Sequence, residues 1–146
     1  MRRGVTLIET LAAVALLGLV GSLLAVGLGG AGDAARIAAA VSAVRDLDQR
    51  ARVVSESAAP ATLRRHSNGR LLIETASPGG EVVIMAERWA PKAVHLTLWT
   101  LSGDAVDAIR FDRRGRSLDY RVDIAAAEWR ISLTVSGMTG WIEEAP

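Results

Sequence analysis

The sequence predicts an α+β fold, in which one long N-terminal helix packs on a small antiparallel β domain. Three observations predict it: no residue from Thr10 to Gly32 is charged, the apolar residues of 33–57 recur every three or four positions, and from residue 61 apolar and polar residues alternate. Apolar residues that recur every three or four positions form one face of a helix. Apolar residues that alternate with polar ones are typical of a half-buried strand. A chain of 146 residues suffices for one such domain.

The uncharged segment is long enough to cross a bilayer. At about 1.5 Å per residue, a helix from Thr10 to Gly32 spans roughly 34 Å, slightly more than the hydrocarbon core of a membrane. A 15.4 kDa protein has too small a core to bury such a helix. Arg2 and Arg3 precede it. Basic residues favour the cytoplasmic side, so we expect the N-terminus in the cytoplasm and the rest of the chain outside.

Glycines near the end of this segment allow a second interpretation. Gly27, Gly29 and Gly32 fit G-x-G-x-x-G, and Glu56 follows at about the distance of a ribose-binding acid. That fingerprint works only between a strand and a helix, and the apolar stretch before Gly27 is far longer than one strand. We therefore interpret them as small residues of a membrane helix. Since each glycine costs up to about 1 kcal/mol relative to alanine, a bend or local melting there is a hypothesis.

The first residues place an acid where a membrane helix would exclude one. The chain begins MRRGVTLIE, so Glu9 lies at the mouth of the apolar run. An intramembrane carboxylate needs a cation at the same depth. Cleavage after Gly4 would create one, the α-amino group of Val5. That amine could neutralise Glu9 of a neighbouring subunit in a helical bundle.

This start resembles the class III signal of type IV pilins and type II secretion pseudopilins. The resemblance covers the basic leader, Gly4, the run Thr6 to Glu9 and the apolar helix. It implies a pilin-like fold, cleavage after Gly4 by a prepilin peptidase, N-methylation of Val5, and assembly that depends on Glu9. Val5 departs from the phenylalanine usual in the family. The alternative is an ordinary signal anchor with an accidental Glu9.

Four segments follow from this interpretation: a leader at 1–4, a transmembrane and assembly helix at 5–32, an amphipathic helix at 33–57 packed on the sheet, and a β-rich periplasmic domain at 58–146. The apolar face of the third segment is formed by Ile37, Val41, Val44, Leu47, Ala51 and Val54. Pro60, after two alanines, is expected to end that helix.

Short runs of alternating residues predict the strands. They span 70–75, 81–86, 93–101, 105–111, 117–124, 129–135 and 140–143, separated by turn signals such as Ser67-Asn68-Gly69 and Ser102-Gly103-Asp104. Short strands joined by tight turns favour antiparallel sheets. We expect the tryptophans to fill the sheet core or cover its edge. An exposed Trp141 would instead be a candidate for protein contact.

Two later segments narrow the resemblance. Residues 109–117, IRFDRRGRS, resemble a hairpin motif of the H-type minor pseudopilins (GspH/FimT-like), and residues 133–142 are similar to their last hairpin, which carries a Thr-Gly turn. This implies a minor pseudopilin, a structural subunit of a type II secretion pseudopilus in the inner membrane with its C-terminal domain in the periplasm. Its partners would be other pseudopilins, the prepilin peptidase and secretion cargo.

The residues show no catalytic or metal-binding pattern. The chain has no cysteine, and its two histidines, His66 and His95, lie in separate strand-like contexts without a third ligand at diagnostic spacing. No G-x-S-x-G or P-loop occurs. We therefore predict no enzyme activity, no cofactor and no metal.

A basic cluster is the candidate for anion or DNA contact. It consists of Arg110, Arg113, Arg114 and Arg116. The formal charge of +1 excludes nucleic-acid binding by bulk electrostatics, and two glutamates near the C-terminus repel phosphate. We expect a solvated hairpin surface. Two alternatives remain: a type IV pilus or competence minor pilin that binds DNA, and a membrane-anchored periplasmic binding module.

Overall fold

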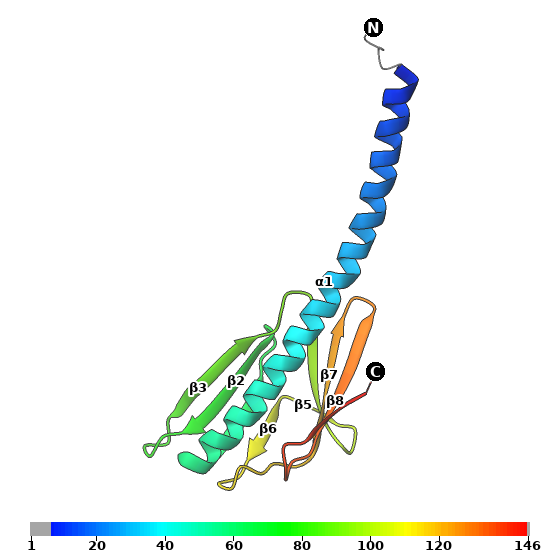
Figure 1. The fold of residues 1–146 in the computed structure, drawn as a ribbon. Coiled ribbons are helices and arrows are strands. Elements are labelled where there is room, and N and C mark those ends of the chain that lie inside the picture. The colour runs from blue at the N-terminus through cyan, green and yellow to red at the C-terminus, as the bar shows by residue number, and fades with distance from the viewer. Residues whose placement is uncertain (1–6, 146) are drawn as a thin grey trace. The chain divides into compact units, whose positions relative to one another are not determined.

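The predicted α+β class is confirmed (Figure 1). A computed structural model describes the backbone of residues 7–145 and the side chains of residues 32–145, apart from that of Trp89. Over this range the chain forms α1 (Leu7–Ser57) and then only strands. Contacts divide it into two units, residues 1–34 and 35–146, and the second unit contains both sheets and the end of α1.

The backbone of α1 is helical through its glycine-rich stretch. Gly27, Gly29 and Gly32 lie within the continuous helix Leu7–Ser57, and the bend or local melting considered for them stays a hypothesis. A helix also stands where a dinucleotide-binding loop needs a strand, which excludes that interpretation. Among the residues with described side chains, no helix is long and apolar enough to span a membrane. The predicted segment 5–32 lies outside those residues, apart from Gly32.

The second half of α1 buries one face in the core of the β domain. The face repeats every three or four residues, as the sequence predicts, and Val54 packs partly buried at its end. The helix ends at Ser57, three residues before Pro60. The buried apolar residues of this face are Ile37, Ala40, Val41, Val44, Leu47 and Ala51.

All strands pair antiparallel, in two sheets. The first sheet has the order β3 (Val82–Trp89), β2 (Arg70–Ala76), β1 (Ala61–Arg65), β6 (Ala108–Phe111). The second has the order β5 (Ala105–Val106), β4 (His95–Thr100), β7 (Tyr120–Ala126), β8 (Trp129–Val135), β9 (Ile142–Ala145). The second half of α1 lies across both sheets (Figure 1).

The prediction of one strand over 105–111 is wrong. Its first part, β5, pairs with β4, whereas its second part, β6, pairs with β1 of the other sheet. The chain changes sheets at Asp107, whose carbonyl accepts a hydrogen bond of 2.8 Å from the backbone N–H of Arg65. The Asp107 carboxylate also pairs with the Arg65 guanidinium. The sequence did not indicate β1 as a separate strand.

We expected the tryptophans to fill the sheet core or cover its edge. Trp129 and Trp141 do not fill the core, because both are exposed. Trp129 follows a tight turn in which Ala127 has a positive φ and is the first residue of β8, paired with Ala126 at the end of the sheet. Trp141 directly precedes β9. The core is aliphatic, with Phe111 and Tyr120 as its large aromatic members.

The edge strand β3 carries a run of exposed apolar residues, Val82, Val83, Ile84 and Met85. The register between β2 and β3 shifts after Ile73, which marks a β-bulge. Such a bulge distorts an edge strand and so disfavours its pairing with a strand of another molecule. The exposed run therefore lies outside the core that stabilises the domain.

This difference predicts a contrast between two isoleucines on neighbouring strands. Ile73→Val should lower the free energy of unfolding by about 1 kcal/mol, because Ile73 is 0% exposed. Ile84→Val should change it by less than about 0.5 kcal/mol, because Ile84 is 52% exposed. Urea denaturation of the two variants measures both values, and equal losses would contradict this assignment of the core.

Candidate interaction surface around Arg52

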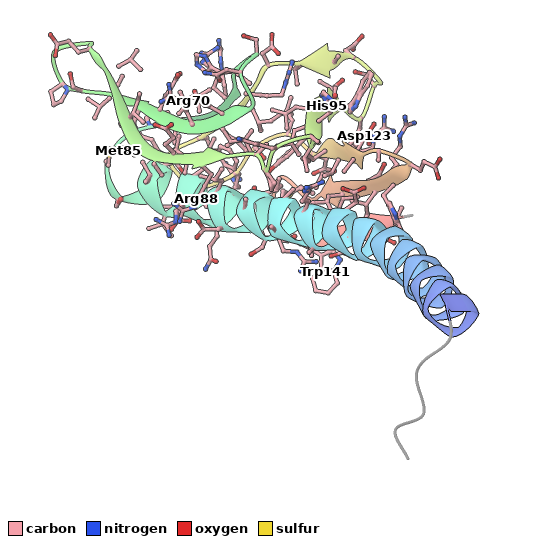
Figure 2. The ribbon with its side chains drawn as sticks, turned by 90° about the horizontal axis from the view of Figure 1, so that it is seen from above. Arg70, Met85, Arg88, His95, Asp123 and Trp141 are labelled. Carbon is pink, nitrogen blue, oxygen red and sulfur yellow. The ribbon has the colours of Figure 1, made fainter. Side chains whose placement is uncertain are left out.

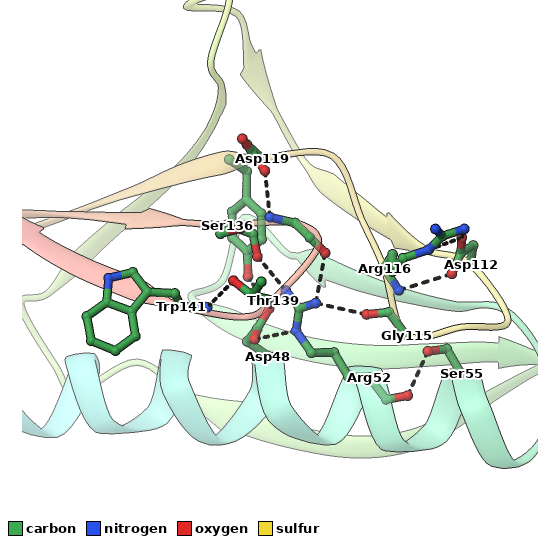
Figure 3. Close-up of polar contacts among 12 residues, drawn as sticks. Asp48, Arg52, Ser55, Asp112, Gly115, Arg116, Asp119, Ser136, Thr139 and Trp141 are labelled. Atoms are coloured by element: carbon green, nitrogen blue, oxygen red, sulfur yellow. Dashed lines mark hydrogen bonds and ion pairs between the residues drawn. The ribbon is translucent and has the colours of Figure 1, made fainter.

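Arg52, near the C-terminal end of α1, uses every N–H of its guanidinium within the protein (Figure 3). Its Nε and Nη2 donate to the two carboxylate oxygens of Asp48, at 2.8 and 3.1 Å. Nη1 donates to the carbonyls of Gly115 and Gly137 at 2.9 and 2.8 Å, and Nη2 to that of Ser136 at 3.1 Å. Since a guanidinium has five donors, none is left for a ligand. We call this set the Arg52 clamp.

Asp48, one turn earlier on α1, is the buried anion of the Arg52 clamp. Besides Arg52, it accepts a hydrogen bond of 2.8 Å from the hydroxyl of Tyr120 on β7. Burial, reinforced by the charge of Asp48, raises the pKa of Tyr120 well above its usual value, so the hydroxyl remains a donor. The ring of Phe111 lies 5.3 Å from the Arg52 guanidinium carbon, within cation–π range.

Glycines allow two loops to approach Arg52. A Cβ on Gly137 would lie 2.2 Å from the backbone oxygen of Ser117, which is too close for any other residue. Gly115 has a φ of +70°, in the left-handed region that favours glycine. These loops belong to the two segments, 109–117 and 133–142, that resemble H-type pseudopilin hairpins. The sequence did not show that both segments meet on one arginine.

Further hydrogen bonds fix the loop from Ser136 to Trp141. The N–H of Gly137 donates to the Asp119 carboxylate at 2.7 Å, and its carbonyl accepts from the N–H of Ser117 at 3.0 Å. Within the loop, the N–H of Ser136 donates to the carbonyl of Trp141 at 2.8 Å. The loop therefore holds its outward side chains in place.

Three large apolar side chains project from these loops. Leu118 is 83% exposed, Met138 72% and Trp141 73%. Trp141 lies beside α1 and points away from the two sheets (Figure 2). Apolar side chains exposed on an ordered backbone are typical of protein-contact surfaces, and tryptophan is enriched at their energetic centres. The sequence-based alternative for Trp141, protein contact, is the one that its exposure favours.

The structure separates the basic cluster into two parts. Arg116 binds the Asp112 carboxylate at 2.9 Å, within the same turn. Arg110, Arg113 and Arg114 are exposed, and none forms an ion pair through its side chain within the part of the chain that the structure describes. Three arginines of the predicted anion or DNA site are therefore accessible, and the fourth, Arg116, stabilises the turn through Asp112.

Asp112 organises that turn. Its Oδ1 accepts the backbone N–H groups of Arg114 and Arg116 at 2.8 and 3.0 Å. These bonds and the Arg116 guanidinium lower the pKa of Asp112 from its usual 3.8. The hydrogen bond from the backbone N–H of Arg116 lowers it most, and that from the N–H of Arg114 comes next.

A lowered pKa makes the turn sensitive to acid. Its contribution to stability is present above the pKa of Asp112 in the unfolded chain, and is lost as pH falls through the lower pKa of the folded state. Carboxyl titration by NMR should give a midpoint for Asp112 below 3.8. In Arg116→Gln the midpoint should rise only part of the way, because both backbone donors remain; a return to the ordinary value would contradict this account.

The two histidines and the N-terminal residues predicted from the sequence lie apart from the Arg52 clamp or outside the described residues. His66 and His95 line one cleft, together with Lys92. No group of three potential ligands able to hold a metal occurs among the described residues. Gly4, Val5 and the side chain of Glu9 lie outside the described residues, so cleavage, methylation and the role of Glu9 stay predictions.

Solved structures with the same fold include the type IV minor pilin FimU of Pseudomonas aeruginosa. The match has a TM-score of 0.55 and 18% sequence identity, and covers 74% of this chain and 87% of FimU. The chain has a pilin-like fold. The minor pseudopilin EpsH from the type 2 secretion system of Vibrio cholerae also matches, with a TM-score of 0.55, 8% identity, and coverage of 73% of this chain and 93% of EpsH.

At these identities the comparisons show the pilin-like fold alone. Neither a protein-family model nor a curated protein matches the sequence. The pilin-like fold predicted from the N-terminal residues and the two hairpin segments is thereby confirmed.

Proposed function

We propose that this chain is a minor pseudopilin, a structural and non-enzymatic subunit of a type II secretion pseudopilus. The pilin-like fold carries the proposal, because structures that share it include a minor pilin and a minor pseudopilin. The string from Gly4 to Glu9 supports it independently, because it supplies a cleavage site and an acid at the start of an apolar helix. The resemblance of the two hairpin segments to H-type minor pseudopilins is the reason for proposing the secretion pseudopilus, and a type IV pilus subunit is the alternative.

The proposed mechanism begins in the inner membrane. A prepilin peptidase cleaves after Gly4 on the cytoplasmic side and methylates the amine of Val5. Residues 5–32 then pack against the helices of neighbouring subunits, and Glu9 sets their register by pairing with the Val5 amine of a neighbour. The β domain remains in the periplasm, where it contacts other subunits or secretion cargo.

Mass spectrometry of the mature protein tests this proposal directly. A chain that begins at methylated Val5 is the expected result. A mature chain that begins near residue 30 would show an ordinary signal peptide and would overturn the proposal. In a deletion strain, loss of secreted proteins with pili intact is expected; loss of pili or of DNA uptake with normal secretion would assign the subunit to a type IV pilus.

Glu9→Ala should leave membrane insertion intact but reduce incorporation into filaments about tenfold, because the buried amine of Val5 loses its partner. Fractionation of membranes and sheared filaments measures the two quantities separately. Glu128→Ala, which removes an exposed acid from the β7–β8 turn, is the matched control and should assemble normally. Normal incorporation of the Glu9 variant would rule out the pairing role.

A further inference from the structure

We propose that a cleft at one end of the β domain binds the phosphate group of phospholipid headgroups in the periplasmic leaflet of the inner membrane. The cleft has a volume of about 430 Å³ and lies between the β1–β2 turn and the β3–β4 loop. Its polar lining comes from His66, Ser67, Asn68, Lys92 and His95. The proposal deepens the proposed function and rests on it, because the predicted membrane segment is what brings lipid to this cleft.

The cleft lies at the end of the β domain where α1 enters it (Figure 1). Because β1 begins just after α1 ends at Ser57, it returns along the helix and places the β1–β2 turn at that end. The β3–β4 loop joins this turn, since the N–H of Ala90 donates to the carbonyl of Gly69 at 2.9 Å. Only residues 33–36 separate the predicted membrane segment from Ile37, which is buried in the core. The proposed function therefore keeps this end of the domain next to lipid headgroups.

The side chains of the cleft offer hydrogen-bond donors and no acid. The rings of His66 and His95 and the hydroxyl of Ser67 can each donate. Asn68 presents its amide nitrogen, because its Oδ1 already accepts the backbone N–H two residues later at 3.2 Å. No aspartate or glutamate is among the described residues that line the cleft. A phosphate diester, whose free oxygens accept hydrogen bonds and carry negative charge, matches this lining.

Lys92 supplies the available positive charge. Arg65 also lines the cleft, but its guanidinium pairs with the Asp107 carboxylate. Lys92 is exposed and has no ion-pair partner within the part of the chain that the structure describes. A lysine ammonium is a compact point charge that suits phosphate. The next residue, Ala93, has a φ of +66°, a strained conformation of the kind that clusters at ligand sites.

The neighbouring strands favour a lipid over a soluble phosphate as the occupant. His95 and Arg130 both pair with Ala125 of β7, so they share one face of the sheet at this end. Trp129, the first residue of β8, lies beside them and is 55% exposed. Exposed tryptophan together with basic residues is typical of protein segments at a membrane interface.

The charge at this end points the same way. Lys92 and Arg130 are exposed cations, Glu128 is an exposed acid, and none of the three forms an ion pair among the described residues. The two cations outnumber the acid, so anionic headgroups should attract this end of the domain within a Debye length.

The full chain in maltoside micelles allows a direct test, because it contains one lysine and two histidines. Mass spectrometry follows the acetylation of Lys92, and NMR follows the rings of His66 and His95, with His→Gln variants to assign them. Added phosphatidylglycerol should slow the acetylation and shift both ring signals. Diacylglycerol with the same chains lacks the phosphate and should do neither. Equal effects of the two lipids, or no effect of either, would overturn the proposal.

A matched pair of variants separates a site from general charge attraction. Lys92→Ala should weaken phosphatidylglycerol binding, measured from the histidine shifts, about fivefold, as expected for one cation near an anionic headgroup. Arg114→Ala removes an equally exposed charge from the hairpin after β6, and should leave the binding unchanged. That hairpin lies at the opposite end, because β6 ends at Phe111, opposite Ala61 at the start of β1. Equal weakening by both variants would overturn the proposal.

Inorganic phosphate and duplex DNA test the other possible occupants. The histidine signals should respond to phosphatidylglycerol at concentrations where neither of these shifts them. Inorganic phosphate that acts at the same concentration as the lipid would make the ligand a soluble phosphate. DNA that does so would make the cleft a nucleic-acid site. Either result would overturn the lipid assignment.

The N-terminal mass of the mature chain separates this proposal from the proposed function. A chain with methylated Val5 whose cleft does not respond to phosphatidylglycerol would overturn the lipid site alone. A mature chain that begins near residue 30 would lack the membrane segment and would overturn both.

Discussion

Arg52→Ala should lower the free energy of unfolding by about 3–5 kcal/mol, the range for breaking a buried ion pair from one side. The side chains of Arg52 and Asp48 are only 13% and 4% exposed. Removing the guanidinium leaves the Asp48 carboxylate with Tyr120 as its remaining hydrogen-bond donor in the Arg52 clamp. It also removes one donor from each of three loop carbonyls, of which those of Ser136 and Gly137 keep a backbone N–H donor. Urea denaturation followed by tryptophan fluorescence measures the loss.

A neighbouring pair on the same helix provides the control. Arg50 binds Asp46 at 2.8 Å with the same i,i+4 spacing, but the two side chains are 51% and 36% exposed. Arg50→Ala should therefore change stability by no more than about 0.5 kcal/mol. Arg52→Lys should fall between the two, because an ammonium keeps the charge but cannot donate in the planar fork. A loss below about 1 kcal/mol for Arg52→Ala would mean that the clamp does not hold the loops.

Regular periodicity made the second half of α1 predictable. Its apolar residues repeat without interruption, and all of those predicted for the face are buried or partly buried. The strand over 129–135 was likewise predicted with its observed bounds. The division of 105–111 between two sheets was not predictable in this way, because it depends on pairing with β4 and with β1, which are distant in sequence.

The exposed residues of the candidate surface were predicted from the sequence, but the buried pair that holds its loops, Arg52 and Asp48, was not. The arginine cluster and Trp141 were predicted from the sequence, because their residue types alone indicate a possible contact surface. Arg52 and Asp48 were missed, since an i,i+4 acid–arginine pair on an amphipathic helix looks the same in sequence as the more exposed pair of Asp46 and Arg50. One signal was present: Asp48 continues the buried stripe of Val44 and Ala51 at helical spacing. An acid within an apolar face predicts a buried partner.

Gly137→Ala should destabilise the protein by about 3 kcal/mol, the upper end of the usual cost of overpacking. The added Cβ would lie 2.2 Å from the Ser117 oxygen and 2.5 Å from the carbonyl carbon of Leu118. These are backbone atoms, so no side-chain rotation can relieve the clash, and the two loops must separate. Separation would also lengthen the hydrogen bonds from Arg52 to Gly115 and Gly137, which adds to the cost.

Gly79→Ala is the matched control, because its Cβ would meet only the Ser77 hydroxyl oxygen, at 3.8 Å. It should change stability by less than about 0.5 kcal/mol, as surface substitutions usually do. Equal stability of the two alanine variants would show that the loops are not in the contact described.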